Sequence, residues 1–135
     1  METTDRTAAP NTLMLWTGRV LSVLVMLFLL MDCTMKLLDL DQVKSAMVQL
    51  EWPVTQDRLI GVIELVCLVL YAVPRTAVFG AVLMTGLLGG AIASHLRHGD
   101  PLFSHTLFGV YVGLMAWGGL WLRDDRLRAL IPLRR

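Results

Sequence analysis

The chain has 135 residues, of which 56% are hydrophobic and 17% are charged, and its mean hydropathy is +0.63. Ordinary soluble domains have a smaller apolar share and a larger charged share, so the excess of apolar side chains must face lipid. The formal net charge is +1 and comes from scattered residues, which excludes a nucleic-acid surface and leaves the lipid bilayer as the expected partner.

The first apolar run lies close to the N-terminus, within residues 14–38. It is longer than the apolar core of a secretory signal peptide, and Arg6 is the only basic residue before it. No small-x-small cleavage site follows it. Asp32 also stands where a lipoprotein signal has a small residue before its cysteine, Cys33. We therefore expect a retained membrane span that follows a cytoplasmic N-terminal tail, residues 1–13.

The segment after this run has the pattern of a short amphipathic helix. Its apolar side chains have the i, i+3, i+4, i+7 spacing of one helix face, at Val43, Ala46, Met47 and Leu50. Asp41 is placed to cap this helix, and Trp52 after it suits the headgroup layer of a membrane. We expect the helix either to lie on the membrane surface or to cover the end of the bundle, through simple packing or in binding a partner.

Three further apolar segments meet or approach the roughly 20 residues that a helix needs to cross a bilayer. They are residues 57–73, 76–96 and 102–122. The second of the four spans is interrupted by Glu64 and closed by Pro74. The sequence thus predicts an all-α protein: an integral membrane four-helix bundle over residues 14–122, followed by a basic cytoplasmic tail, residues 123–135.

Glycines recur every four residues in the third and fourth spans, as Gly86 with Gly90 and Gly109 with Gly113. Small residues at this spacing let helix backbones approach closely inside a membrane. They predict close packing within the bundle or, alternatively, a homo-oligomer or a contact with a membrane-protein partner through these two spans.

Basic residues are distributed unequally between the two sides of such a bundle. The side with the termini holds Arg6, Arg19, Arg75, Arg123, Arg126, Arg128, Arg134 and Arg135, and the other side holds Lys36, Lys44, Arg58 and Arg97. Cytoplasmic loops carry the excess of Lys and Arg in membrane proteins. We therefore expect a multi-pass protein of the bacterial cytoplasmic (inner) membrane with both termini cytoplasmic.

Five ionisable residues within the predicted spans gather in the extracytoplasmic half of the bundle, whereas Arg19 stands apart near the cytoplasmic end of the first span. They are Asp32, Lys36, Glu64, His95 and His105. Such residues are costly inside a membrane and usually face the bundle interior or a wet cavity. Asp32 and Lys36 share a helix face and can pair. Glu64 has no opposite charge in its own span, so it pairs with Lys36 or a histidine, or it carries protons or contacts a ligand. The five residues predict a polar pocket for ligand binding or proton exchange, or ion pairs that only hold the helices together.

Cys33 and Cys67 lie in the same half. They form either a disulfide or redox pair, or they are two inert buried thiols. Glu64, His95 and His105 are of types that bind zinc or iron. No paired-ligand spacing such as His-x-x-x-His occurs within one helix, and we expect His98 in a loop, so we predict no metal site. Motifs of soluble enzymes are absent from the sequence, which leaves open whether the chain is an enzyme and which residues would be catalytic.

A series of short motifs follows the chain from Gly18 to the C-terminus. They are Gly18-Arg19, Asp32, Lys36, Glu64-Leu65, Pro74-Arg75-Thr76, Gly89-Gly90-Ala91, His95, residues 99–105, Trp117-Gly118-Gly119-Leu120 and Leu122-Arg123-Asp124. In their order and spacing these motifs resemble the DoxX-like family of small bacterial four-helix membrane proteins. The resemblance implies the four-helix fold and a relation to a membrane subunit of an archaeal thiosulfate:quinone oxidoreductase, with other relatives linked to thiol redox and membrane-protein assembly.

Our first hypothesis is a redox-associated membrane subunit, or a protein that binds a small lipophilic ligand such as a quinone while Glu64 and a histidine exchange protons. The alternative is an assembly or scaffolding factor whose buried ion pairs are purely structural. A third hypothesis, a membrane isomerase resembling four-helix sterol-binding proteins, is an analogy of architecture alone. A quinone is the only cofactor that these hypotheses suggest.

Overall fold

The computed structural model describes residues 11–131, which are helical and contain no strand. The four longer helices are α1 (Thr12–Leu37), α3 (Asp57–Ala72), α4 (Ala77–His98) and α5 (Phe108–Arg123). The shorter elements are α2 (Asp41–Gln49), α6 (Asp125–Leu130), the 3-10 turn η1 (Val54–Gln56) and the π-helical turn η2 (Leu102–Thr106). The prediction of an all-α chain is confirmed.

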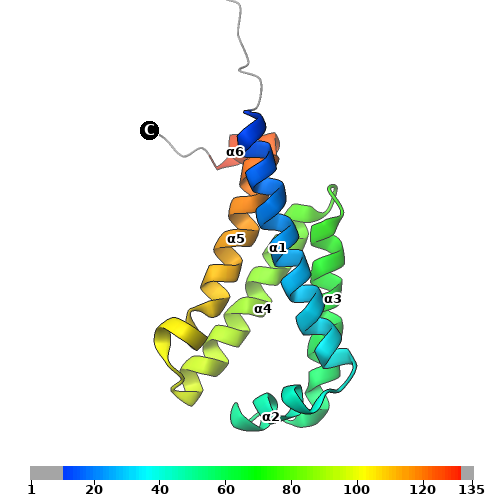
Figure 1. The fold of residues 1–135 in the computed structure, drawn as a ribbon, viewed down its shortest axis with the longest axis vertical. Helices are drawn as coiled ribbons and strands as arrows, with labels where there is room; N and C mark the ends of the chain where they lie inside the picture. The colour runs from blue at the N-terminus through cyan, green and yellow to red at the C-terminus, as the bar shows by residue number, and fades with distance from the viewer. Residues whose placement is uncertain (1–10, 132–135) are drawn as a thin grey trace, which may run out of the picture.

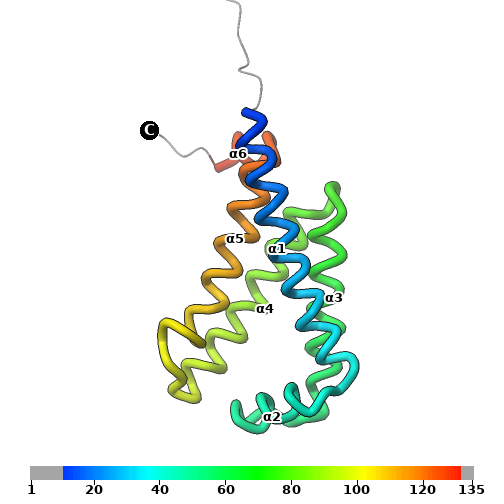
Figure 2. Tube along the Cα trace, in the orientation of Figure 1, coloured from blue at the N-terminus to red at the C-terminus, as the bar shows by residue number. Residues whose placement is uncertain are grey.

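The four longer helices pack side by side around one core. Helix α1 packs against α3 and α5, and α4 packs against the same two helices. Each of the four contributes fully buried residues to the core: Val25, Tyr71, Met84 and Ala116. Helix α2 lies across one end of these helices, and α6 lies at the other end, beside the start of α1 (Figure 1). Figure 2 shows the same path of the chain as a simple trace.

Glycines allow close approaches between helices at two places. A Cβ atom added to Gly80 on α4 would lie 2.3 Å from the backbone nitrogen of Tyr71 on α3. A Cβ atom added to Gly119 on α5 would lie 2.7 Å from Ser22 Oγ and 2.9 Å from the Ser22 backbone nitrogen on α1. No side chain fits at these contacts, so backbone meets backbone in both places.

The predicted glycine pairs behave differently from one another. Gly109 packs against Ile92, and Gly113 lies within van der Waals distance of Leu88, so both face α4. A Cβ atom added to Gly86 or Gly90 would meet nothing within 4 Å. The expectation of close packing within the chain is therefore wrong for Gly86 and Gly90, because no neighbouring helix approaches either glycine closely. The alternative of a homo-oligomer stays a prediction.

Local sequence signals end two of the helices. Pro74 cannot continue α3 and holds Val73 in an extended conformation, with φ −81° and ψ 119°. Gly99 ends α4 in the left-handed region at φ +82°, which glycine adopts without strain. His98, expected in a loop, is the last residue of α4. His105 lies in η2, and the regular helix of the fourth predicted span begins only at Phe108.

Two helices, α1 and α4, are long and apolar enough to cross a membrane. Helices α3 and α5 have 16 residues each, fewer than the roughly 20 that a span needs, and the turns η1 and η2 precede them directly. The outward faces of all four expose large apolar side chains, such as Leu27, Val66, Phe79 and Leu114. An apolar surface of this extent is typical of lipid contact rather than of a soluble monomer.

Candidate functional site

Lys36 on α1 joins two carboxylates into one polar group. Its Nζ atom donates a hydrogen bond of 2.7 Å to Glu64 Oε2 on α3 and another to Asp32, one turn earlier on α1. The exposed fraction of the side chain is 2% for Glu64, 18% for Lys36 and 38% for Asp32. The group thus leads from the interior, between α1 and α3, to the surface of the molecule. We call these three residues the Lys36 group.

The approach of α1 and α3 depends on Gly61. A Cβ atom at Gly61 would lie 2.9 Å from Lys36 Cβ, so the base of the lysine side chain rests directly on the glycine backbone. Glu64 follows Gly61 by three residues and therefore lies almost one helical turn further along the same side of α3. This placement brings its carboxylate to the end of the lysine side chain.

The Lys36 group has more acceptors than the single ammonium can satisfy. One cation faces two carboxylates, so the group either carries a net negative charge or holds a proton. Glu64 Oε1 is buried and has no hydrogen-bond partner among residues 11–131. A buried oxygen without a partner is uncommon and costly. The Lys36 group therefore has an open position for a donor, from a ligand, a water molecule or a bound proton.

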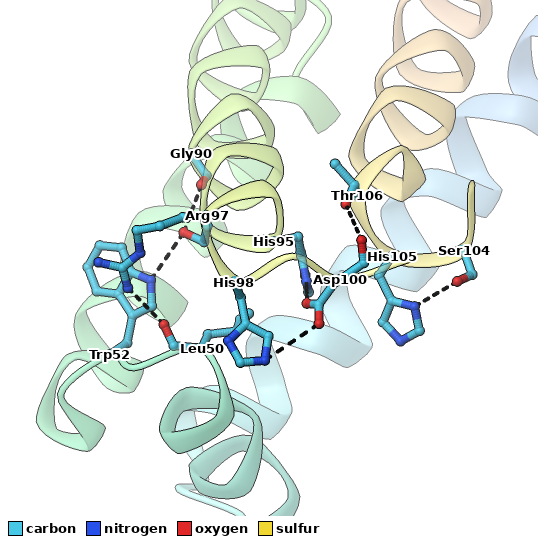
Figure 3. A network of polar contacts seen from close by, with 11 residues as sticks. Leu50, Trp52, Gly90, His95, Arg97, His98, Asp100, Ser104, His105 and Thr106 are labelled. Atoms are coloured by element: carbon cyan, nitrogen blue, oxygen red, sulfur yellow. Dashed lines mark hydrogen bonds and ion pairs between the residues drawn. The ribbon is translucent and has the colours of Figure 1, made fainter. Parts of the chain in front are cut away.

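A second polar group surrounds Asp100, in the turn after α4 (Figure 3). His95 Nδ1 lies 2.5 Å from Asp100 Oδ2, and His98 Nε2 lies 3.7 Å from Asp100 Oδ1. The Asp100 side chain is only 8% exposed. The hydrogen bond with His95 is the main reason why the pKa of Asp100 lies below its usual value. The ring of His105 lies 6.0 Å from that of His95, but it is exposed and contacts Ser104 Oγ.

The five predicted site residues thus fall into two groups. Within residues 11–131, no hydrogen bond or ion pair connects the Lys36 group with Asp100 and its histidines. Glu64 therefore has Lys36 as its partner and not a histidine. Glu64, His95 and His105 do not form a ligand set for a metal ion, and the described range contains no other cluster of three such residues.

Cys33 and Cys67 are both buried, and both are free thiols. Cys33 Sγ lies 3.4 Å from the carbonyl oxygen of Leu30 within its own helix. Cys33 and Cys67 therefore form no disulfide in the structure.

Helix α2 and the segment after it close over the end that carries both groups. Trp52 Nε1 donates to Ser94 Oγ at 3.1 Å, and Arg97 donates to the carbonyl oxygen of Leu50 at 2.9 Å (Figure 3). Met47 is buried beneath α2. The expectation that Asp41 caps α2 is wrong, because Asp41 is the first helical residue and the cap position belongs to Leu40. Of the two placements expected for α2, these contacts favour the one in which α2 covers the end of the packed helices.

Asp39 connects α2 to the start of α3. It accepts from Lys44 Nζ at 3.0 Å and lies 3.5 Å from an Arg58 nitrogen. The hydrogen bond from Lys44 is the main reason why its pKa lies below the usual value.

The profile of the DoxX-like family matches residues 20–119, well over half of the chain. The chain belongs to the DoxX-like family. Neither the curated proteins nor the solved structures contain a significant match to it. Family membership, together with the two apolar helices of spanning length, identifies a membrane protein. The matched region includes both polar groups of this DoxX-like chain.

Two polar features of the DoxX-like chain were not predicted as sites. Asp100 belongs to the Gly-Asp-Pro motif, and its position between three histidines was the signal that could have revealed it. A buried network also connects Ser22, Tyr71 and Arg123 near the opposite end: Tyr71 Oη lies 3.1 Å from Ser22 Oγ, and Arg123 Nε donates to the same oxygen at 3.1 Å. Its members are far apart in sequence, so no local pattern indicates them.

Asp100→Asn is expected to lower the thermal stability of the DoxX-like chain at pH 6, and this loss is expected to shrink progressively as the pH falls below about 4. The lowered pKa means that the folded state favours the carboxylate, so the stabilisation is complete above the unfolded-state pKa of about 3.9. It is lost as the pH falls through the lowered pKa. Unfolding temperatures in detergent from pH 3 to pH 7 measure the difference from wild type.

Asp41→Asn is the matched control for this series, because it removes an exposed carboxylate at the start of α2. An equal loss of stability from pH 3 to pH 7 in Asp100→Asn would contradict a role for the ionised carboxylate.

Proposed function

We propose that this DoxX-like chain crosses the membrane four times, with α1, α3, α4 and α5 as the spans of a four-helix bundle. The exposed apolar side chains on all four helices support this arrangement. The turns η1 and η2 lengthen the two shorter helices toward a full span. The arginines near the chain ends support an orientation with both termini on the cytoplasmic side of a bacterial inner membrane.

Within this bundle, we propose that the Lys36 group binds the polar end of a small lipophilic ligand of the quinone class. The observation that carries the proposal is the buried Glu64 Oε1 atom, which lacks a partner among residues 11–131 beside a charged lysine. Lys36 is a donor suited to a ligand carbonyl, and Glu64 is an acceptor suited to a ligand hydroxyl. A quinone and its quinol present these two groups in turn.

An apolar groove between α3 and α4 supports the same proposal. It has a volume of about 290 Å³, and its lining includes Ile63, Cys67 and Gly86. Cys67 lies on α3 less than one turn beyond Glu64, so the groove begins near the Lys36 group. The groove would hold the apolar part of the ligand while the Lys36 group holds its polar end.

A proton path follows from the graded exposure of the Lys36 group. Reduction of a quinone to a quinol takes up two electrons and two protons. Asp32 at the surface and Glu64 in the interior share Lys36, so protons can pass between them to the ring oxygens. An electron-donating partner, a flavin or iron–sulfur subunit, would supply the electrons. A chain that binds the quinone and supplies protons, while a partner supplies electrons, acts as a redox-associated membrane subunit.

Glu64→Gln is expected to weaken the binding of a short-chain quinone by about tenfold or more, the range for losing a hydrogen bond to a charged group. Titration of decylubiquinone into the full chain in lipid nanodiscs, followed by calorimetry, measures the affinity. Glu51→Gln, which alters an exposed carboxylate after α2, is expected to leave the affinity unchanged. Absence of binding to the wild type, or equal binding to Glu64→Gln, would refute the ligand assignment.

A second candidate function is assembly or scaffolding of membrane proteins. One observation favours it: Lys36 pairs with both carboxylates, and its contact with Glu64 joins α1 to α3. On this hypothesis Glu64→Gln lowers the unfolding temperature or the recovery of a partner, and no quinone affinity exists to be lost. The same titration therefore separates the two functions.

A further inference from the structure

A second cavity lies at the opposite end of the molecule from the Lys36 group. It has a volume of about 430 Å³, which is in the range of small-molecule sites, and it lies between the α3–α4 turn and the α5–α6 junction. Its lining includes the buried Leu120 and five charged residues: Arg75, Arg123, Asp124, Asp125 and Arg126. Figure 1 shows the α3–α4 turn and α6 at the same end as the start of α1.

The two acidic residues of this cavity already have partners. Asp124 Oδ1 accepts from the backbone nitrogens of Arg126 at 2.9 Å and Leu127 at 3.3 Å, and so caps α6. Asp125 forms an ion pair with Arg128. Arg128 in turn donates to the carbonyl oxygen of Leu122 at 2.7 Å, which holds this pair against the end of α5. Among residues 11–131, neither carboxylate lies within ion-pair distance of Arg75, Arg123 or Arg126.

Arg123 is held in a fixed position. Its Nε atom donates to Ser22 Oγ at 3.1 Å, and its guanidinium lies 5.5 Å from the centre of the Tyr71 ring. This contact uses one donor of the guanidinium, and the two terminal nitrogens have no hydrogen-bond partner among residues 11–131. A guanidinium anchored through Nε presents its terminal nitrogens as a fork for an anion.

Arg75 and Arg126 complete the positive side of the cavity. Both are exposed, and in the described range neither lies within ion-pair distance of a carboxylate. Three guanidinium groups therefore line one cavity without acidic partners among these residues. The lining carries three positive and two negative charges, so an anion bound beside the guanidinium groups would lower their mutual repulsion.

We propose that this cavity binds a phosphate group, which belongs either to an anionic lipid headgroup or to a free phosphate compound. Guanidinium groups match the geometry of phosphate oxygens with two parallel hydrogen bonds. Leu130 at the end of α6 and Ile131 just after it are exposed apolar residues that follow the cavity arginines in the sequence. They suit contact with acyl chains when the phosphate belongs to a lipid. The site is independent of the quinone proposal, since the two share no residue.

The test uses the full chain in a neutral detergent and three probes: short-chain phosphatidylglycerol, short-chain phosphatidylcholine and inorganic phosphate. We expect phosphatidylglycerol to bind more tightly than phosphatidylcholine in microscale thermophoresis. Arg75→Gln and Arg126→Gln are each expected to weaken this binding about fivefold, the usual contribution of one basic residue near an anionic membrane surface. Both side chains are exposed, so the variants should fold, which their unfolding temperatures will verify.

Arg58→Gln is the matched control, because it removes an exposed arginine from the other end of the molecule and should not affect binding. Inorganic phosphate that binds with the same dependence on Arg75 and Arg126 supports a free phosphate compound. Binding of phosphatidylglycerol alone supports a lipid headgroup. The proposal is overturned if neither probe binds, or if Arg58→Gln weakens binding as much as Arg75→Gln does.

Discussion

Gly80→Ala is expected to destabilise this DoxX-like chain by about 3 kcal/mol, at the upper end of the cost of overpacking a core. The added methyl group would lie 2.3 Å from the backbone nitrogen of Tyr71 and 2.7 Å from its Cα atom. Backbone atoms cannot move aside as the end of a flexible side chain can, so α3 and α4 would have to separate. Tyr71 is completely buried, and its hydroxyl would be pulled away from the carbonyl oxygen of Ala116.

Gly86→Ala is the control in the same helix. A Cβ atom there meets nothing within 4 Å, and alanine favours a helix over glycine by roughly 0.5–1 kcal/mol. We therefore expect no loss of stability, or a small gain. Unfolding temperatures and denaturant midpoints in detergent compare the two variants. Equal effects of the two substitutions would show that the approach of α3 and α4 does not depend on Gly80.

Lys36→Met is expected to cost about 3–5 kcal/mol, the usual penalty for removing one partner of a buried ion pair. The substitution keeps the unbranched stem that rests on Gly61 but leaves Glu64 buried without a cation. Asp32 is less affected because its side chain is 38% exposed. Unfolding free energies of the wild type, Lys36→Met, Glu64→Leu and the variant with both substitutions form a thermodynamic cycle.

The double variant, Lys36→Met with Glu64→Leu, is expected to regain most of this stability. Replacing a buried ion pair by apolar residues of similar size is often neutral or stabilising. Recovery would mean that the fold does not require the pair, which agrees with a role in ligand binding. A double variant as unstable as Lys36→Met alone would favour the scaffolding function.

The helices of this chain were predictable from local features. Apolar runs of sufficient length indicate the segments, Pro74 ends α3 through its own geometry, and Gly99 ends α4 because it adopts a positive φ without strain. The amphipathic pattern around Met47 likewise predicted α2, although Asp41 does not cap it. The π-helical turn before α5 and the short helix α6 were not predicted, because neither has an apolar period long enough to recognise.

The polar sites were predictable only in part. The i, i+4 spacing of Asp32 and Lys36 predicted their pairing, since both lie on one helix. For Glu64 the sequence left two partners open, Lys36 or a histidine, because Lys36 lies 28 residues earlier on another helix and no local spacing connects them. His95 pairs with Asp100 five residues away, in a turn whose conformation depends on Gly99. The arginines of the proposed phosphate cavity were interpreted only as a sign of the orientation in the membrane. Their convergence requires the α3–α4 turn to lie beside the α5–α6 junction.

The sequence by itself determined the helical class of this protein, its affinity for lipid and its family, because hydropathy and backbone preferences act within a few residues. Only the tertiary structure decided which side chains meet. That outcome depends on the rotation and crossing of helices, which Gly61, Gly80 and Gly119 set by admitting a neighbouring helix where a Cβ atom would not fit. Gly86 and Gly90 have the four-residue glycine spacing that those three lack, yet they have no such neighbour, so the pattern of small residues alone does not identify the contact.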